Sequence, residues 1–452
     1  MSQKPSAEQN DQLQPHNSVW DIIRYLIVVV LLVVGIWYVY FQKPVIRTAQ
    51  ETKGTTIGTD YVVKVADFMK GTNFDVWKNI EILIRQRLDG IDRMTSIYRA
   101  DSEVSRFNNS GSTDWFNVSK DTAEVVQTAL EISQLTEGAF DITVAPLVEL
   151  WGFGVNRQHH LTTNDLEEKT NQIKQKICYD KLEVRSHPPA LKKSIPELQI
   201  DLSAIARGYA VDCVAELLEE NGFMNYMVEV GGEVRCRGNK GTAGDWMIGI
   251  EKPLIVSTNE FSGLQRKLRI GDRALATSGD YQNYREIDGV RFSHFIDPRT
   301  GFPTEHLAIN EVKTLQSELL QKESLQPELL QTEQLQTEQL QMEPLQTESL
   351  QQELLPQKSL PAESSQTKPL QNERLLTKQL PSDIKERLGS VSVLAKTCVR
   401  ADALATAFFV LGEHKGLELA EKHGIAVLFL FRTEQKDRPI REAVSTTFPK
   451  SE

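Results

Sequence analysis

Apolar positions between residues 74 and 94 recur at the spacing of an amphipathic helix. Ile80, Ile84, Leu88 and Ile91 fall on one face when the chain turns every 3.6 residues. The pattern predicts a helix over Phe74–Met94. On the same grounds we predict helices over residues 121–136, 206–221 and 401–411, the first of them opened by an aspartate in the N-cap position.

Short runs that are rich in β-branched and aromatic residues predict strands between these helices. The runs are Tyr61–Val65, Tyr226–Val230, Trp246–Glu251, Leu268–Ile270 and Ser390–Ala395. Helices and strands mix without the regular alternation of a parallel sheet, so the pattern favours an α+β fold. The chain has no glycine-rich dinucleotide fingerprint after a strand and no P-loop sequence, so neither of these nucleotide sites is predicted.

An uncharged apolar run covers residues 25–41, and a membrane-spanning helix takes roughly 17–25 residues. Trp37, Tyr38 and Tyr40 stand at one end of the run, as in an interfacial aromatic belt. The polar stretch before the run is long and no small-residue cleavage site follows it. An uncleaved transmembrane anchor is therefore favoured over a cleaved signal peptide or a buried helix. Basic residues flank the run on both sides, so charge does not settle its orientation.

Leucine recurs every five residues from Leu315 to Leu360 and again from Leu370 to Leu380, in units close to Leu-Gln-Thr-Glu-Gln. A five-residue step turns a helix by about 500°, so the leucines form no stripe and a coiled coil is not favoured. Glutamate usually stands two residues before each leucine, where a narrow stacked β-coil needs a small side chain. The repeat predicts a solvated, disordered, low-complexity insert.

The predicted organisation is one globular domain that the repeat interrupts. A long insertion is tolerated because the entropy of closing a loop grows only with the logarithm of its length. In order, we expect a polar tail (1–24), the anchor (25–41), a linker (42–52), the first part of a catalytic domain (53–310), the leucine/glutamine/glutamate repeat (311–388) and the second part of the domain (389–452).

Composition excludes some classes of function. The 452 residues carry a formal net charge of −11, whereas a nucleic-acid-binding domain usually presents a basic face, so no nucleic-acid partner is expected. Cys178, Cys213, Cys236 and Cys398 form no C-x-x-C pair and no Cys/His cluster, which argues against a zinc site. These cysteines leave the redox compartment open.

Two polar residues of the predicted C-terminal helix suit a hard cation. Asp402 and Thr406 are four positions apart, so they lie on one helical face. Their oxygens match the preference of Mg²⁺, which keeps water or substrate phosphate in the rest of its shell. In a separate loop, His294 and Asp297 place a titratable base beside a carboxylate. Together these residues indicate metal-assisted phosphoryl chemistry.

Eight motifs follow one another in a fixed order along the globular part. They are Thr56–Tyr61, Met94–Asn108, Gly138–Gly154, Asp201–Asp212, Gly231–Arg235, Thr277–Tyr281, His294–Gly301 and the helix of Asp402 and Thr406. In this order and content the chain resembles the FAD:protein FMN transferases, the ApbE-like flavin transferases. The resemblance covers about residues 55–309 and 389–411.

This resemblance implies a two-lobed, mixed α/β catalytic domain of the ApbE-like type and Mg²⁺-dependent cleavage of FAD. FMN would pass to a threonine or serine hydroxyl of a target protein, and AMP would leave. Targets of such enzymes are typically subunits of membrane redox pumps. Together with the anchor predicted at residues 25–41, the resemblance implies a single-pass protein of the bacterial inner (cytoplasmic) membrane, with its catalytic domain on the periplasmic, outer side.

The matching positions also imply roles for individual residues. Asp402, Thr406 and the backbone carbonyl of Ala204 would hold the Mg²⁺. His294 is the catalytic candidate, and Asp297 could orient it. The FAD contacts would come from Ile57, Tyr98, Ala139, Phe140, Asp141, Asp201, Arg207, Gly279, Asp280 and Tyr281.

Other functions use the same residues. Water in place of the protein hydroxyl would make the enzyme an FAD pyrophosphatase that releases FMN and AMP. A flavin-binding or scaffold protein with a retired active site is a third hypothesis, in which the repeat would recruit a partner. For Asp141 the alternative to a ligand contact is a structural role, because an aspartate there can cap its own turn.

Overall fold

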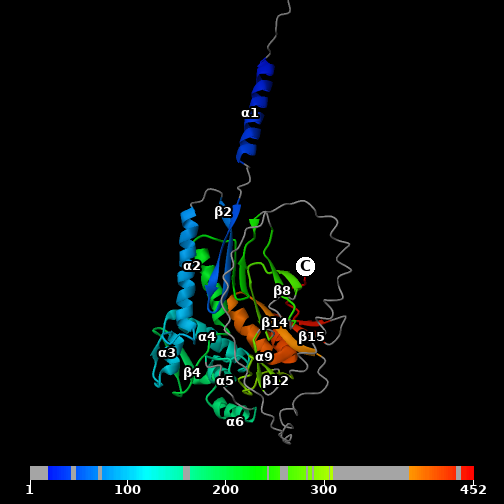
Figure 1. The fold of residues 1–452 in the computed structure, drawn as a ribbon. Coiled ribbons are helices and arrows are strands. Elements are labelled where there is room, and N and C mark those ends of the chain that lie inside the picture. Colours follow the sequence, from blue (N-terminus) through cyan, green and yellow to red (C-terminus); the bar gives the residue numbers. More distant parts are fainter. Residues whose placement is uncertain are drawn as a thin grey trace, which may run out of the picture.

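A computed structural model describes residues 19–41, 47–69, 74–155, 163–241, 244–254, 263–280, 283–287, 290–304, 306–308, 386–433 and 439–451, and the structural statements below concern these residues. The longer helices are α1 (Val19–Phe41), α2 (Phe74–Thr95), α3 (Glu103–Asn109), α4 (Lys120–Leu135), α5 (Ala145–Leu150), α6 (Thr163–Lys174), α7 (Ala206–Glu220) and α9 (Cys398–His423), as Figure 1 shows.

An eight-stranded sheet forms the centre of the molecule, in the order β1-β2-β6-β7-β10-β14-β15-β16. Its described pairings are all antiparallel, which confirms the α+β reading. The strands are β1 (Arg47–Thr56), β2 (Thr59–Met69), β6 (Tyr226–Val230), β7 (Glu233–Arg237), β10 (Ala274–Gly279), β14 (Glu386–Ala395), β15 (Ala426–Thr433) and β16 (Ile440–Val444).

Smaller sheets complete the fold. One contains β11 (Tyr284–Ile287), β12 (Val290–Ser293) and β13 (His306–Ala308), and another contains β3 (Phe116–Asn117), β5 (Pro189–Lys193) and β4 (Leu182–Ser186). A two-stranded sheet pairs β8 (Met247–Glu251) with β9 (Leu264–Arg269).

Apolar clusters cover both faces of the central sheet. Side chains of β15 alternate between them, with Val427 and Phe429 in the cluster beneath the helices and Leu428 and Leu430 in the cluster beneath the β8–β9 pair. Because both faces are covered, β14 and β15 are buried along most of their length. Helices α7 and α9 pack directly on the sheet, while α2 packs on α7 and α4 packs on α9 (Figure 1).

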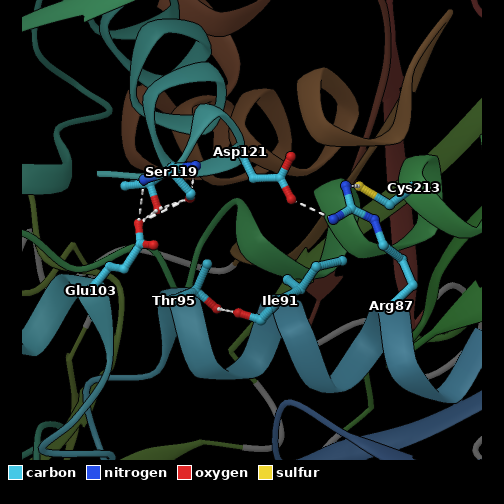
Figure 2. Close-up of polar contacts among 8 residues, drawn as sticks. Arg87, Ile91, Thr95, Glu103, Ser119, Asp121 and Cys213 are labelled. Carbon is cyan, nitrogen blue, oxygen red and sulfur yellow. Dashed lines mark hydrogen bonds and ion pairs between the residues drawn. The ribbon is translucent and has the colours of Figure 1, made fainter. Parts of the chain in front are cut away.

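Polar contacts join α2, α3, α4 and α7 at the edge of this core. Arg87 of α2 reaches both the carboxylate of Asp121 on α4 and the Sγ of Cys213 on α7, and Glu103 of α3 accepts from the N–H and hydroxyl of Ser119 (Figure 2). Burial raises the pKa of the Cys213 thiol to about 12, so this cysteine stays a neutral packing residue.

Helices α7 and α9 approach each other closely at Gly208. A Cβ at this position would lie 2.4 Å from the carbonyl oxygen of Cys398 and 2.7 Å from the Cβ of Asp402. The Gly208 N–H donates to Asp402 Oδ2 at 2.9 Å. One turn along α7, Asp212 accepts from the N–H groups of Cys398 and Val399 at 2.9 and 2.8 Å, which caps the start of α9. Only glycine fits at position 208 without moving one of the helices.

Most predicted elements are present, and their ends differ for identifiable reasons. The helix over 121–136 begins at Lys120, because Ser119 is its N-cap; placing Asp121 at the cap was wrong, and that side chain bonds Arg87 instead. Helix α9 runs past the predicted end at Leu411, where Gly412 with φ 72° kinks it. Strand β1 begins at Arg47 inside the expected linker, and β14 begins at Glu386 inside the expected repeat.

The predicted anchor corresponds to α1, which stands apart from the body in Figure 1. Its described side chains, from Ile23 to Val34, are exposed. Among the residues that the structure describes, no helix meets the combined length and hydropathy of a membrane span. Residues 310–385, which hold the repeat, lie outside the described residues, as do residues 1–18.

The close approach of α7 and α9 predicts that a larger side chain at position 208 destabilises the protein. We expect Gly208→Ala to lower the free energy of unfolding by about 1–3 kcal/mol, because the new Cβ meets backbone that cannot move alone. Gly90→Ala is the matched control: it lies in α2 with nothing within 4 Å of the added carbon, so it should leave stability unchanged or raise it by up to about 1 kcal/mol. Urea denaturation measures both, and equal effects would contradict the packing argument.

Candidate functional site

Two hairpin turns meet at one end of the central sheet. The β1–β2 turn contains Ile57 and Gly58, and the β6–β7 turn contains Gly231 and Gly232. The Gly231 N–H donates to the carbonyl of Asp60 at 3.0 Å, which joins the two hairpins. Ile57 has φ 48° and Gly58 has φ 72°, as a two-residue hairpin turn requires, although this left-handed conformation is unfavourable for a β-branched residue.

Arg207, in the first turn of α7, lies against the second of these hairpins. Its guanidinium is 3.2 Å from Oε1 of Glu233, which begins β7 and is buried. It also lies 3.5 Å from the carbonyl oxygen of Gly231. Burial raises the pKa of Glu233 well above its usual value, and the negative charge of Asp402 adds to this shift while Arg207 opposes it.

Asp402 and Thr406 lie on the buried side of α9, one turn apart. Burial raises the pKa of the Asp402 carboxyl to about 6, against the opposing effects of Arg207 and of the Gly208 N–H. The Thr406 hydroxyl is 3.1 Å from that of Ser278 near the end of β10. Ala204 lies in the turn just before α7. The described residues contain no cluster of three or more histidine, cysteine, aspartate or glutamate side chains that could hold a metal ion, so a cation here would also need hydroxyl, carbonyl and substrate oxygens.

His294 follows β12 and is half-buried. Its Nδ1 lies 2.9 Å from the carbonyl oxygen of Asn283, so Nδ1 is the donor. Its ring packs on Phe295, which in turn stacks on Phe409 of α9 with ring centroids 4.0 Å apart. Burial lowers the pKa of His294; Arg207 adds to this effect and Asp280 opposes it. Through Phe295, His294 is thus held beside α9.

Asp297 does not partner His294 among the described contacts. Its two carboxylate oxygens each accept from the Arg299 guanidinium at 2.8 Å, and the Arg299 N–H donates to one of them. Both residues belong to a tight turn in which the Gly301 N–H bonds the Asp297 carbonyl. The expectation that Asp297 orients His294 is corrected, because the nearer arginine takes the carboxylate and a backbone carbonyl holds the imidazole.

The carboxylates of Asp141 and Asp201 cap turns of the chain. Asp141 accepts from the N–H and hydroxyl of Thr143, both at 2.7 Å, and from the Tyr179 N–H at 2.8 Å. Asp201 accepts from the N–H and hydroxyl of Ser203 at 2.8 and 2.5 Å. The Asp201 N–H donates to the carbonyl of Ile142 at 2.7 Å, which joins the segment of residues 139–141 to the turn before α7.

The remaining predicted FAD contacts differ in exposure. The Ala139 and Phe140 side chains are buried, so a ligand would meet this segment through its backbone and Asp141. Tyr98 is 59% exposed and therefore available for stacking. Gly279 ends β10, and the Asp280 carboxylate that follows is held by Arg432 at 2.5 and 2.6 Å. Tyr281 lies outside the described residues.

Comparison with known proteins decides the family. A sequence model of the ApbE family matches residues 57–317 and 381–429. The chain belongs to the ApbE family. It is 34% identical over 395 residues to the FAD:protein FMN transferase of Vibrio cholerae, covering 87% of this chain and 90% of that one. It is 38% identical over 258 residues to the FAD:protein FMN transferase of Escherichia coli K12, covering 56% of this chain and 70% of the relative.

Solved structures of the family share this fold. The flavin transferase ApbE from Vibrio cholerae superposes with a TM-score of 0.62 at 32% identity, covering 89% of this chain and 98% of that one. The apo form of the Pseudomonas stutzeri flavinyl transferase ApbE gives a TM-score of 0.61 at 26% identity, with 89% and 96% covered. The mixed α/β fold of the ApbE type is thereby confirmed.

Two residues of this ApbE-family site were quoted within motifs but given no individual role from sequence. Glu233 follows the Gly231-Gly232 pair, and an acid that directly follows a glycine turn and begins a strand was the available signal. Ser278 stands beside the predicted Gly279. A third residue, Arg432, pairs with Asp280 from 152 positions away, and a partner so distant in the chain gives no local signal.

The raised pKa of Asp141 predicts how the stability of the FAD-free protein changes with pH. Burial raises this pKa from 3.8 to about 6, so the folded state binds more protons than the unfolded state between these pH values. The contribution of Asp141 to the free energy of unfolding is fully present below pH 3.8 and is lost as the pH rises through about 6. Between pH 4 and pH 7, urea denaturation should show the free energy of unfolding falling by about 1–3 kcal/mol more in the wild type than in Asp141→Asn. The exposed Asp114→Asn should follow the wild type, and parallel curves for all three proteins would contradict the assignment.

Proposed function

We propose that this protein is an FAD:protein FMN transferase, with Asp402, Thr406, Arg207 and His294 as its working residues. The observation that carries the proposal is their placement around α9. The N–H of Gly208, the residue after Arg207 in α7, donates to Asp402 at 2.9 Å, and Phe295, the residue after His294, stacks on Phe409 of α9 with ring centroids 4.0 Å apart. Membership of the ApbE family and the printed names of the relatives supply the reaction.

The donor set suits Mg²⁺, which would be held by Asp402, Thr406 and the carbonyl of Ala204. A buried carboxylate beside a hydroxyl gives oxygen ligands of the kind that Mg²⁺ prefers, and leaves positions for phosphate oxygens. Bound there, the cation would neutralise charge on the FAD pyrophosphate. Arg207 adds a fixed positive charge, and the Ile57 turn, Tyr98 and the segment of residues 139–141 are proposed to contact the flavin or adenine parts.

His294 can act as the general base. The Asn283 carbonyl accepts from Nδ1, which leaves Nε2 as the unprotonated nitrogen of a neutral imidazole. Because burial lowers its pKa, the neutral form predominates at pH 7. Nε2 would take the proton of the target hydroxyl as its oxygen attacks the FMN phosphorus. The phosphorus–oxygen bond to AMP breaks, AMP leaves with that oxygen, and a phosphoester joins FMN to the target.

The test is incubation of the full-length protein with FAD, Mg²⁺ and a candidate threonine-bearing target, read by intact mass and in-gel flavin fluorescence. We expect the target to gain the mass of FMN minus water while AMP appears. His294→Asn should slow this by about 10²–10⁴-fold with FAD still bound, while the exposed His187→Asn should not. Free FMN without labelled protein would identify a pyrophosphatase, and bound but intact FAD would support the flavin-binding protein instead.

We further propose that α1 anchors the protein in the bacterial cytoplasmic membrane, with the catalytic domain outside. The support is the uncharged run of residues 25–41 within α1 and the exposure of its described apolar side chains. The target would then be a subunit of a membrane redox pump that faces the same side. Full-length protein should stay with carbonate-washed membranes, and deletion of residues 1–44 should release it. Recovery of the full-length protein in the soluble fraction would overturn the anchor.

A further inference from the structure

Glu233 is a buried acid, and one of its carboxylate oxygens lacks a hydrogen-bond partner among the described residues. Its side chain is 2% exposed, and Oε1 pairs with the Arg207 guanidinium at 3.2 Å. Its Oε2 is buried without a hydrogen-bond partner among the described residues. A buried carboxylate oxygen is expected to be satisfied, so an orphan of this kind needs an explanation.

The other buried acids nearby provide the comparison. One oxygen of Asp212 accepts from the Cys398 N–H and from Arg235, and the other accepts from the Val399 N–H. Asp141 likewise has N–H or hydroxyl donors on both oxygens. Among the described residues, Glu233 Oε2 is the one carboxylate oxygen that is fully buried without a hydrogen-bond partner, which sets Glu233 apart from these two acids.

Two contacts from adjacent residues of α7 place Glu233 near Asp402. The Arg207 guanidinium pairs with Glu233 Oε1 at 3.2 Å, and the N–H of Gly208, the next residue, donates to Asp402 Oδ2 at 2.9 Å. Arg207 attracts both carboxylates, so it lies between two buried acids with only one positive charge. Gly231 and Gly232, both with positive φ, turn the chain so that Glu233 enters the sheet at this point.

We propose that Glu233 is a further oxygen donor of the cation site, with Oε2 binding the divalent cation or a water of its shell. The inference rests on the cation of the proposed function. A second carboxylate would give the site more negative charge to hold a hard cation, while Oε1 keeps Arg207 in place for the FAD phosphates.

The experiment is a titration of the full-length protein with Mn²⁺, in which electron paramagnetic resonance reports the free ion, without FAD and then with FAD. Glu233→Gln keeps the size of the side chain and removes its charge. We expect its Mn²⁺ dissociation constant to rise about tenfold or more, as for other groups that support a metal site.

Glu229→Gln is the matched control. Glu229 lies on the same hairpin, and its Oε1 accepts the Gly232 N–H at 2.8 Å, a bond that glutamine can keep. The control should stay within about twofold of the wild type, and equal weakening by both variants would indicate only a loss of nearby charge and overturn the proposal. Unchanged Mn²⁺ affinity of folded Glu233→Gln, or weaker FAD binding alone, would also overturn it and leave Glu233 as a support for Arg207.

The wild type separates this inference from the function on which it rests. If the wild type binds Mn²⁺ and Asp402→Asn does not, the proposed cation site stands, whatever the result for Glu233→Gln. A wild type that binds no Mn²⁺ with or without FAD overturns the cation itself, and the role of Glu233 with it.

Discussion

The site depends on the close approach of α7 and α9 at Gly208. The absence of a side chain there lets a backbone N–H of α7 reach the carboxylate of Asp402. From the next turn of α7, Asp212 caps the first N–H groups of α9 and is itself held by Arg235 of β7. The position of α9, and with it the Asp402–Thr406 face, is thus set by α7 and the sheet together.

That arrangement concentrates negative charge where water is largely excluded. Asp402 and Glu233 are both buried, and a single guanidinium, that of Arg207, serves both. Burial raises the pKa of each acid, so the cation-free site favours protons that a divalent ion would displace. Stability alone would be better served by apolar side chains at these positions, which is why the cluster is better explained by ligand binding.

The sequence predicted what depends on local pattern and motif. The period of the apolar residues located α2 and α7, the β-branched run located β6, and the ordered motifs indicated Asp402, Thr406 and His294. Pairings set by tertiary structure were not predictable in this way. Asp297 was expected to serve His294, yet Arg299 two residues later takes its carboxylate, and the imidazole bonds a backbone carbonyl that carries no sequence signal. Arg432 reaches Asp280 only because β10, β14 and β15 are neighbours in the sheet.

We propose that the buried face of α9 holds a divalent cation for FAD cleavage. The most direct measurement is a crystal structure of the protein with Mn²⁺ and FAD, recorded with anomalous scattering at the manganese edge. We expect an anomalous peak between the Asp402 carboxylate and the Thr406 hydroxyl, at oxygen-ligand distances of roughly 2.0–2.6 Å. FAD bound with no peak at this face, or with manganese held only elsewhere, would contradict it.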